Sequence, residues 1–437
     1  MGEVDVSRYR RILIRIKEVY RTHGLKALVA KISGRLFQKG SSILLLLLHS
    51  PWAVPAVYLM RWLKPWVLVR VGTFNSGRIG HFAGDVGHHY AALNEQPANC
   101  VDLYWLLKKT ANDFWATMVS RSFPVSEWVC HLDRWNRIIP GGEEHCRLSS
   151  ETGTRDIHGV LERHPNSMPF TLKEDQLAKD WLRGLGWKEG GRFVCLLVRD
   201  DEYLANDPLH GDGSDSSYSA WQCHAYRNSD IATYVPAIEW LADQGVWVFR
   251  MGKKMATPMP SSHDRVIDYA FREDKSDFMD VWLFAHCDLC ISTGSGPDMI
   301  SDVYRRPLLV VNYLQLRNLW SWSNAVHAPK HLMWGDSGRK LTWKEHLNHS
   351  YYRTNDYSEE GIDVKDLSPE ELLEITKECW MRLDGKWKDE QVDTECQKKF
   401  WEILEAYPDF AQFHGWIHPE SRVSSFFLRS NTDFLTE

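Results

Sequence analysis

A glycine-rich loop that ends in histidine is the first group of residues in the chain with catalytic potential. Residues 72–81 read GTFNSGRIGH, and Asp85 follows His81 at a spacing of i+4. On a helix, residues four apart share one face, so Asp85 could orient the imidazole of His81 or replace it as a base. The pair suits removal of a proton from a hydroxyl. The alternative is a structural histidine at a helix start, bonded to the backbone.

The same loop has the composition of a ligand-binding turn. Glycines let the backbone approach a ligand, and a helix that starts here would offer unpaired N–H groups. The spacing fits neither the dinucleotide fingerprint nor a Walker loop. We expect this loop to face an acceptor, through Asn75, Arg78 and Gly80.

Arginines follow three predicted strands or loops in the second half of the chain. Arg199 ends a buried strand, Arg227 lies in the segment YRNSD over 226–230, and Arg250 precedes Gly252 after another strand. Arginine matches the geometry of phosphate oxygens, so these residues predict an anionic ligand at one sheet edge. A structural ion pair is the alternative for Arg199. The remaining candidates for this site are Tyr226, Asn228 and Asp230.

A second loop of small residues lies between a predicted strand and a predicted helix. Residues 292–302 read STGSGPDMISD. We expect the loop to hold a phosphate at the helix N-terminus and Asp298 to contact a ribose or a sugar. The alternative is a tight turn that binds nothing. The candidate loop residues are Thr293, Gly294, Ser295 and Gly296.

The acidic and cysteine residues do not form a recognisable metal motif. Asp200 and Asp201 are the nearest approach to paired carboxylates at a strand end, so we expect chemistry that needs neither a metal nor a cofactor. The nine cysteines are scattered, and Cys287 and Cys290 lack a second pair at zinc-ligand spacing. We interpret that pair as part of a buried strand in a protein of a reducing cytoplasm.

Alternating strands and helices must position these residues. A first series comprises a strand over 66–71, a helix over 81–93 and a strand over 100–106. A second series contains predicted strands at 193–198, 246–250, 265–269, 288–292 and 308–312 and helices at 230–244, 277–286 and 298–304. This pattern predicts an α/β fold with parallel, doubly wound sheets. Two facing Rossmann-like domains with a helical tail are the outline of the GT-B architecture.

The expected domains follow from these patterns. We predict a basic amphipathic and hydrophobic membrane-associating segment over 1–64 and an acceptor-side α/β domain over 65–188. A ligand-binding α/β domain follows over 189–390, and a C-terminal helical tail over 391–437.

The front of the chain differs in charge from the rest. Residues 1–40 carry a net charge of +7, whereas the remainder carries −13, which disfavours a nucleic-acid-binding body. The apolar run over 43–60 contains His49, Pro51 and Pro55. We expect peripheral or monotopic attachment to an anionic membrane surface, with a single membrane span or packing on the chain's own domain as the alternatives.

The motifs resemble those of a known family. Residues 69–85, 226–252 and 290–313 are similar to a family of bacterial glycosyltransferases from surface-polysaccharide and sugar-modification gene clusters, and the likeness covers about 66–385. It implies a nucleotide-sugar donor and a glycan or lipid-linked acceptor at the cytoplasmic face of the inner membrane. His81 or Asp85 would be the base, and Arg199, Arg227 and the loop 293–296 would stabilise the leaving phosphate.

Two other functions remain open from the sequence. One is a nucleotide-sugar epimerase or hydrolase on the same fold, and the other is a non-catalytic sugar-binding protein. The 21 tryptophans suit sugar stacking, but core packing accounts for most of them equally well.

Overall fold

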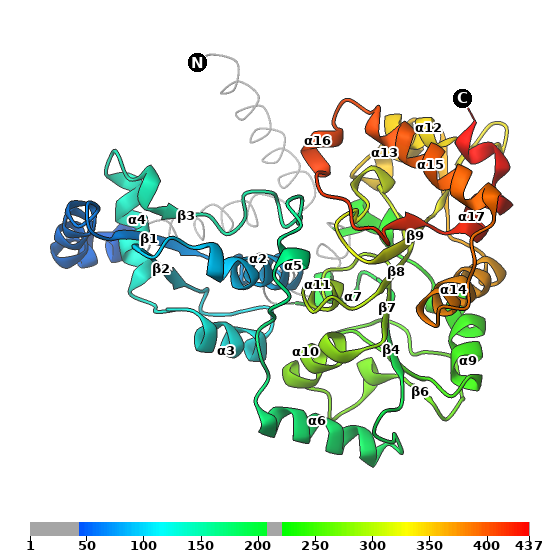
Figure 1. Cartoon of the computed structure of the whole chain (residues 1–437), viewed down its shortest axis with the longest axis horizontal. Helices are drawn as coiled ribbons and strands as arrows, with labels where there is room; N and C mark the ends of the chain where they lie inside the picture. Colours follow the sequence, from blue (N-terminus) through cyan, green and yellow to red (C-terminus); the bar gives the residue numbers. More distant parts are fainter. Residues whose placement is uncertain (1–42, 208–220, 437) are drawn as a thin grey trace, which may run out of the picture. The chain divides into compact units, whose positions relative to one another are not determined.

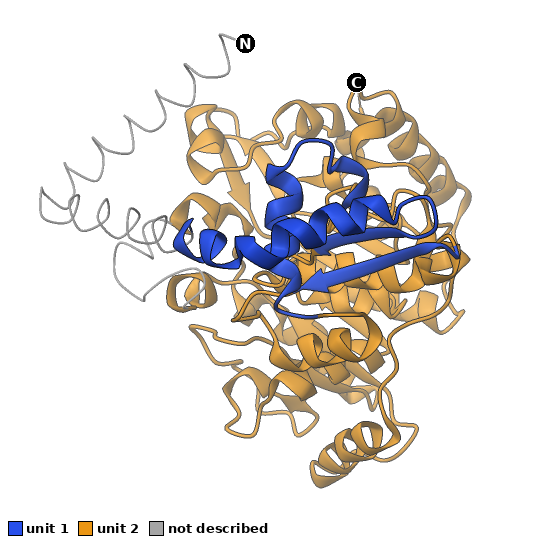
Figure 2. Cartoon of the chain, turned by 90° about the vertical axis from the view of Figure 1, so that its left-hand side faces the viewer, with its two compact units in different colours: residues 1–72, 98–105, 126–147 blue, residues 73–97, 106–125, 148–437 orange. Residues whose placement is uncertain are grey.

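The computed structural model describes residues 43–207 and 221–436, and the chain forms two compact units (Figure 2). Unit 1 comprises residues 1–72, 98–105 and 126–147, and unit 2 comprises 73–97, 106–125 and 148–437. The predicted basic helix over 12–36 lies outside the described residues.

Unit 1 is built on a small sheet with the strand order β2-β1-β3. The strands are β1 (Leu68–Thr73), β2 (Cys100–Trp105) and β3 (Cys146–Arg147), and β1 and β3 run parallel. Helix α4 (Val129–Ile138) contributes Val129 and Leu132 to the core of this unit.

The apolar run predicted near the front is one continuous helix, Ile43–Trp62, which continues through both prolines. Its length and composition would allow it to cross a membrane. Ala53, Val57 and Met60 are buried in the core of unit 1, at the spacing of one helix face. The last turn is fixed by Arg61, which donates to the carbonyls of Asn136, Ile139 and Pro140. Among the described residues, the contacts within unit 1 thus cover this one narrow face of the helix.

Unit 2 contains a seven-stranded sheet in the order β12-β9-β8-β7-β4-β5-β6, and every neighbouring pair is parallel. Its strands, listed along the chain, are β4 (Phe193–Leu197), β5 (Trp247–Arg250), β6 (Val266–Ile267), β7 (Leu289–Ser292), β8 (Leu308–Tyr313), β9 (Ala325–Pro329) and β12 (Arg422–Val423). The predicted strands of the second series all occur, with ends within three residues. A two-stranded antiparallel ribbon joins β10 (His331–Trp334) to β11 (Ile362–Lys365).

Helices cover both faces of this sheet. Figure 1 shows α10 and α11 on one side and α9 and α14 on the other. The helices of unit 2 are α2 (Ile79–Ala91), α3 (Asp113–Ser122), α5 (Val160–Arg163), α6 (Leu172–Gly184), α7 (Glu202–Asn206), α9 (Val235–Asp243), α10 (Asp277–His286), α11 (Asp298–Val303), α12 (Trp343–Asn348), α13 (Thr354–Glu359), α14 (Pro369–Leu383), α15 (Gln391–Glu405), α16 (Phe410–Phe413) and α17 (Ser425–Ser430).

The strand order reverses between β4 and β7, where the chain turns from building one half of the sheet to the other. In open parallel sheets, such a switch point leaves a crevice at the carboxyl ends of the strands, where ligands bind. Arg199 follows β4 and Thr293 follows β7, so two of the sequence-predicted candidates lie at this point.

The predicted domain over 65–188 is divided between the two compact units, and helix α2 falls in unit 2. There it packs on α11 of the same unit. Two glycines on one face of α2 allow this contact, because a Cβ at Gly87 would lie 2.3 Å from Cγ1 of Val303 and a Cβ at Gly84 would lie 2.9 Å from Cγ of Met299. The first glycine-rich loop and the second one are thereby held in the same unit.

The predicted C-terminal tail is integrated into unit 2. Strand β12 pairs with β9, and Phe400, Phe427 and Phe434 belong to the same hydrophobic core as the sheet. The fully buried carboxylate of Glu378 accepts hydrogen bonds of 2.9 Å from the N–H groups of Ser425 and Phe426. The tail contributes a sheet edge and core side chains, which a helix-only expectation missed.

Candidate active site

A cavity of about 490 Å³ lies at the switch point, and all of its walls belong to unit 2. Its size is within the range of small-molecule sites. The first turn of α2, the end of β4 and the loop before α11 contribute to it. Eight of the residues predicted from the sequence line this cavity: Arg78, Gly80, His81, Arg199, Arg227, Gly252, Ser295 and Gly296.

Arg199 is held rigidly at the end of β4. Its N–H donates to Oγ1 of Thr293 at 3.1 Å, its carbonyl accepts from the N–H of Ser229, and its Nε donates to Oδ1 of Asn228 at 3.3 Å. The residue is 8 % exposed. Burial, together with the positive charge of Arg227, lowers the pKa of its guanidinium to about 10. The site thus holds a desolvated cation in the vicinity of a second one.

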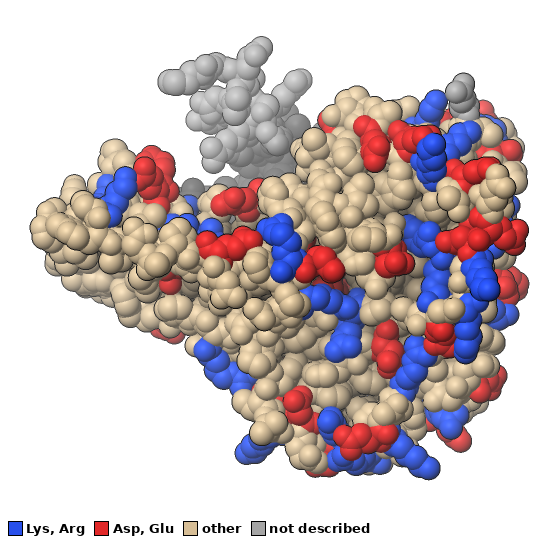
Figure 3. Space-filling model, viewed as in Figure 1, with Lys and Arg blue, Asp and Glu red and all other residues tan. Residues whose placement is uncertain are grey.

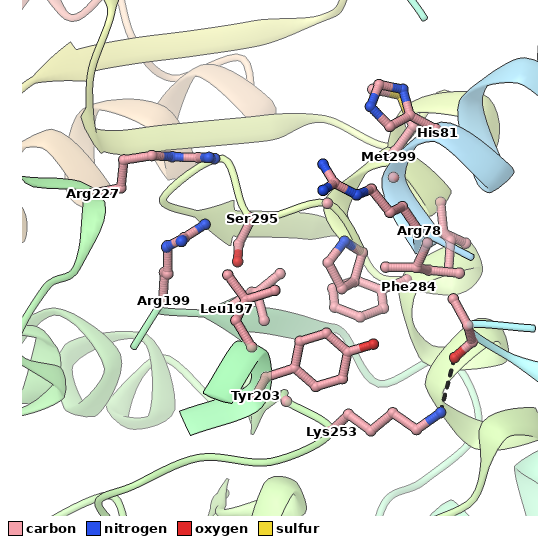
Figure 4. A pocket seen from close by; sticks show the side chains of 18 of the residues that line it. Arg78, His81, Leu197, Arg199, Tyr203, Arg227, Lys253, Phe284, Ser295 and Met299 are labelled. Carbon is pink, nitrogen blue, oxygen red and sulfur yellow. Dashed lines mark hydrogen bonds between the residues drawn. The ribbon is translucent and has the colours of Figure 1, made fainter. Parts of the chain in front are cut away.

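Three guanidinium groups converge on one space. Figure 4 shows Arg199 and Arg227 entering from one side and Arg78 from the other, with Ser295 between them. Arg227 is oriented by a 2.5 Å hydrogen bond from Nη2 to the carbonyl of Gly294. Within the described part of the chain, none of the three arginines forms an ion pair with a carboxylate. Such a cluster is stabilised when an anion binds.

The loop before α11 approaches the first loop closely. A Cβ at Gly80 would lie 3.0 Å from Cα of Gly296, which itself has a φ of 95°. The close contact at position 80 and the positive φ at position 296 both favour glycine. Two backbone segments from distant parts of the sequence can therefore meet beside the arginines.

The predicted phosphate site at the start of α11 is altered by Asp298. This side chain is fully buried, and its Oδ2 accepts from Oγ of Ser292 at 2.6 Å and from the N–H of Ser295 at 2.9 Å. The carboxylate therefore shapes the loop and takes a donor that a phosphate would have used. Helix α11 has only six residues, whereas α2 has thirteen and points its first turn at the cavity.

Several predicted ligand residues support the site from outside the cavity. Thr293 and Asn228 hold Arg199. Tyr226 packs on Tyr357 in a separate hydrophobic cluster, and Asp230 caps the following helical turn through the N–H of Ala232. The remaining ones are also away from the cavity wall: Asn75, Asp85, Arg250, Gly294 and Asp298.

Arg250 differs from Arg199 although both end neighbouring strands. It is 1 % exposed, pairs with Asp268 at 3.2 Å and donates to the carbonyl of Thr257 at 3.0 Å. Its charge is thus already compensated inside the fold. The sequence pattern does not distinguish the two arginines, because the partner Asp268 is 18 residues away.

His81 and Asp85 are connected through a residue that the sequence analysis did not single out. Oγ1 of Thr154 lies 2.7 Å from Nδ1 of His81 and 2.7 Å from Oδ1 of Asp85. Asp85 also accepts from Oγ of Ser149. Burial raises the pKa of the Asp85 carboxyl, against the opposing effect of these two hydroxyl donors. His81 lines the cavity, whereas Asp85 is 2 % exposed and lies behind it.

Aromatic and further polar residues complete the walls. Trp320 and Trp322 lie nearly parallel, at 15°, with ring centroids 6.1 Å apart. Tyr203 lines the lower part of the view in Figure 4, next to Lys253, whose Nζ donates to the carbonyl of Ala111 at 2.8 Å. Such rings suit stacking against sugar or base surfaces.

The carboxylates near the cavity are engaged with protein groups. Asp200 accepts from the N–H of Glu202 at 3.0 Å through one oxygen and from the N–H of Ala256 at 2.9 Å through the other. Over residues 43–207 and 221–436, no group of three His, Cys, Asp or Glu side chains could hold a metal ion. Cys287 and Cys290 are fully buried, and Cys290 lies within β7, as predicted. Cys287, however, is the C-cap residue of α10 and lies outside the strand, contrary to the prediction.

Asp280 gives the cavity a titratable group near neutral pH. Burial, together with the charge of Asp277, raises its pKa to about 7. The folded state then holds a proton that the unfolded state releases, so stability falls as pH rises between about pH 4 and pH 7. Over this pH range, we expect the free energy of unfolding of Asp280→Asn to decrease by on the order of 2 kcal/mol less than that of the unmodified protein. Melting temperatures at about pH 5 and about pH 7.5 measure it, and an unchanged difference would contradict the assignment.

No protein-family model matches the sequence. No curated protein matches it either. The chain is similar to solved glycosyltransferase structures. A glycosyl transferase family 9 protein from Veillonella parvula DSM 2008 has a TM-score of 0.36 and 8 % identity, covering 60 % of this chain and 86 % of that one.

Two further similar structures come from E. coli. ADP-heptose lps heptosyltransferase II has a TM-score of 0.32 and 9 % identity, over 60 % of this chain and 90 % of that one. Heptosyltransferase WaaC with ADP has a TM-score of 0.29 and 13 % identity, over 56 % of this chain and 87 % of that one. At these TM-scores the similarity assigns neither a fold nor an activity to this chain.

Thr154, Arg155 and Tyr203 are cavity residues that sequence reasoning missed. Thr154 and Arg155 lie in a loop over 148–159 without a recognisable motif. The one local signal is glycine at 153 and 159, both with positive φ, which marks a loop of constrained shape.

Proposed function

We propose that this chain is a glycosyltransferase that transfers a sugar from a nucleotide-sugar donor to an acceptor hydroxyl. The observation that carries the proposal is the convergence of Arg78, Arg199 and Arg227 beside Ser295, at the switch point of a parallel sheet. A nucleoside diphosphate leaving group carries at least two negative charges and matches this cluster in charge and in hydrogen-bond geometry.

The proposed reaction assigns a role to each side of the cavity. His81 removes the proton of the acceptor hydroxyl while its oxygen forms a bond to the anomeric carbon of the sugar. The bond from that carbon to the phosphate oxygen breaks, and the electron pair leaves with the nucleoside diphosphate. Arg199 and Arg227 stabilise the charge that develops there, because both are oriented before the ligand arrives.

The reaction as proposed uses the donor as a substrate and needs no cofactor. Arginines, rather than a metal ion, would neutralise the diphosphate. Each oxygen of Asp200 accepts one backbone N–H, so this carboxylate already has a role in holding its loop.

We propose further that the protein works at the cytoplasmic face of the inner membrane, attached peripherally or monotopically, on a lipid-linked or surface-glycan acceptor in bacterial polysaccharide biosynthesis. An apolar surface of unit 1, here called the unit 1 apolar face, supports the membrane attachment in this proposal. Figure 3 shows the surface of unit 1 in this view as mostly uncharged. Its exposed residues are Ile43, Leu44, Leu45, Leu47, Leu48, Trp52, Tyr58, Leu59, Trp62, Trp66, Trp128 and Ile138. Exposed tryptophan and tyrosine are enriched at lipid interfaces.

Vesicle binding tests this location. In flotation with phosphatidylglycerol–phosphatidylethanolamine vesicles, we expect the full chain to float and Leu44→Glu with Leu48→Glu to lose at least about tenfold in bound fraction. Leu172→Glu with Leu177→Glu is the matched control, since both leucines are exposed on α6 of unit 2. Equal flotation of the two double variants would contradict the proposal.

Turnover of a panel of radiolabelled nucleotide sugars tests the activity itself. A thermal-shift screen first selects the nucleotide, because a ligand that binds the folded state raises the melting temperature. Acceptor-dependent release of the nucleoside diphosphate supports the transferase. Acceptor-independent conversion would indicate an epimerase or hydrolase, and binding without turnover would indicate a binding protein; either result contradicts the proposal.

A further inference from the structure

The contact of Thr154 with both His81 and Asp85 defines a direction of hydrogen bonding. An ionised carboxylate can only accept, so the Thr154 hydroxyl donates its single hydrogen to Oδ1 of Asp85 at 2.7 Å. The same oxygen can then only accept from Nδ1 of His81, also at 2.7 Å. His81 must therefore carry its hydrogen on Nδ1 when it is neutral. Over the described ranges no hydrogen bond reaches its Nε2.

We propose that Thr154 is a positioning residue that fixes the Nδ1–H tautomer of His81 and leaves Nε2 as the proton acceptor of the cavity. This inference rests on the proposed function and deepens it, since it identifies how the base is prepared. When Nε2 takes the proton of the acceptor hydroxyl, the new imidazolium keeps its Nδ1–H bond to Thr154. The charge of Asp85 stabilises the imidazolium through that hydroxyl.

The backbone and the methyl group of Thr154 are closely constrained by their surroundings. Thr154 is 5 % exposed, and its backbone has a φ of 69°, a left-handed conformation that β-branched residues rarely adopt. Its backbone N–H donates a hydrogen bond to Oγ of Ser150 at 2.8 Å. Helix α2 makes room for it, because a Cβ at Gly84 would lie 2.3 Å from Cγ2 of Thr154.

The second carboxylate oxygen of Asp85 accepts a hydrogen bond from the hydroxyl of Ser149, which lies in the same loop as Thr154. The loop over 149–154 therefore supplies both hydroxyl donors to a carboxylate on α2. The two segments are separated by more than sixty positions in the sequence, yet every member of the relay belongs to unit 2.

Nitrogen-15 NMR of the full chain labelled in histidine tests the tautomer without requiring any activity. The His81 signal is identified by its absence in His81→Gln. We expect the Nδ1–H form to dominate in the unmodified protein, and the Nε2–H form in Thr154→Val. Thr and Val are both β-branched and nearly isosteric, so the backbone strain at this position is the same in both. Thr154→Ser should keep the original tautomer.

The control is Thr152→Val in the same loop, whose hydroxyl instead donates to the carbonyl of Arg155. It should leave the His81 signal unchanged. An Nε2–H tautomer in the unmodified protein, or an unchanged tautomer in Thr154→Val with an unchanged melting temperature, would overturn the proposal. If Thr154→Val fails to fold, Asp85→Ala replaces it. The Thr154 hydroxyl then has no carboxylate to donate to and can donate to Nδ1 of His81, so the same shift to the Nε2–H tautomer is expected.

Kinetics separates this proposal from the proposed function. With an active donor and acceptor, Thr154→Val should lower kcat by about 10- to 100-fold with the donor KM unchanged, and Thr154→Ser should restore most of the rate. A protein without turnover but with the Nδ1–H tautomer would contradict the transferase assignment and support the relay. Full turnover in a folded Thr154→Val would contradict the relay alone.

Discussion

Replacing Arg199 by alanine is expected to weaken the binding of nucleoside diphosphates by about 30- to 150-fold, equivalent to about 2–3 kcal/mol. The guanidinium is desolvated, is held by Thr293 and Asn228, and has no carboxylate partner in the described structure. Its interaction with a phosphate would be charge-assisted and preorganised. Calorimetric titration with ADP, UDP, GDP and CDP measures the loss.

The same substitution should leave the unliganded protein as stable as before, or more stable. Arg199 is a buried cation whose pKa is lowered by desolvation and by Arg227, so its removal relieves a cost in the empty site. This result would be unusual for a buried residue, and it distinguishes a binding residue from a structural one.

Arg250 provides the matched comparison. It ends the strand next to that of Arg199 and is also buried, but it pairs with Asp268. Arg250→Met should cost about 3–5 kcal/mol of stability, because it leaves the partner charge uncompensated. Its effect on diphosphate affinity in the folded protein should be small. Unchanged diphosphate affinity in Arg199→Ala would contradict the assignment of the site.

Replacing His81 by glutamine is expected to lower kcat of the proposed transfer by about 10²- to 10⁴-fold, the usual contribution of a general base. Donor affinity should change by less than about twofold, because the arginine cluster is intact. The separation of the two effects follows from the geometry, in which His81 interacts with Thr154 and Asp85 rather than with the arginines.

His89→Gln is the control for this variant. His89 lies on the same helix and packs against Phe74 at 5.1 Å between ring centroids, away from the cavity wall. It should keep near-normal turnover. If His81→Gln retained more than about half of the activity, another group would have to be the base.

The two glycine-rich loops could be found from the sequence because their signals are local. Both follow a strand, both open a helix, and the predicted elements around them agree with the structure to within a few residues. Arg199, at the end of β4, could also be found from the sequence, because ligands bind at the carboxyl edge of a parallel sheet.

The sequence could not distinguish residues that line the cavity from residues that stabilise the surrounding structure. Arg199 and Arg250 look equivalent in the chain, and only the long-range partner Asp268 makes one structural. The position of Asp298 in the motif predicts contact with a ligand. In the structure its buried carboxylate instead accepts hydrogen bonds from Ser292 and Ser295 of its own loop. The first outcome depends on a partner 18 residues along the chain and the second on the complete burial of Asp298, and the local motif encodes neither.

The sequence by itself determined the alternating α/β class, the parallel second sheet, the polar loops that face its edge and the apolar helix at the front of the chain. These follow from the periodicity of apolar residues and from the conformational demands of glycine and proline. The tertiary structure alone decided that α2 packs on α11 within unit 2 and that Thr154 connects His81 to Asp85. It also decided that three arginines, none of them ion-paired with a carboxylate within the described residues, meet beside Ser295. The first two features arise from close packing between segments more than sixty residues apart, where a single methyl group at Gly84 or Gly87 would prevent the approach.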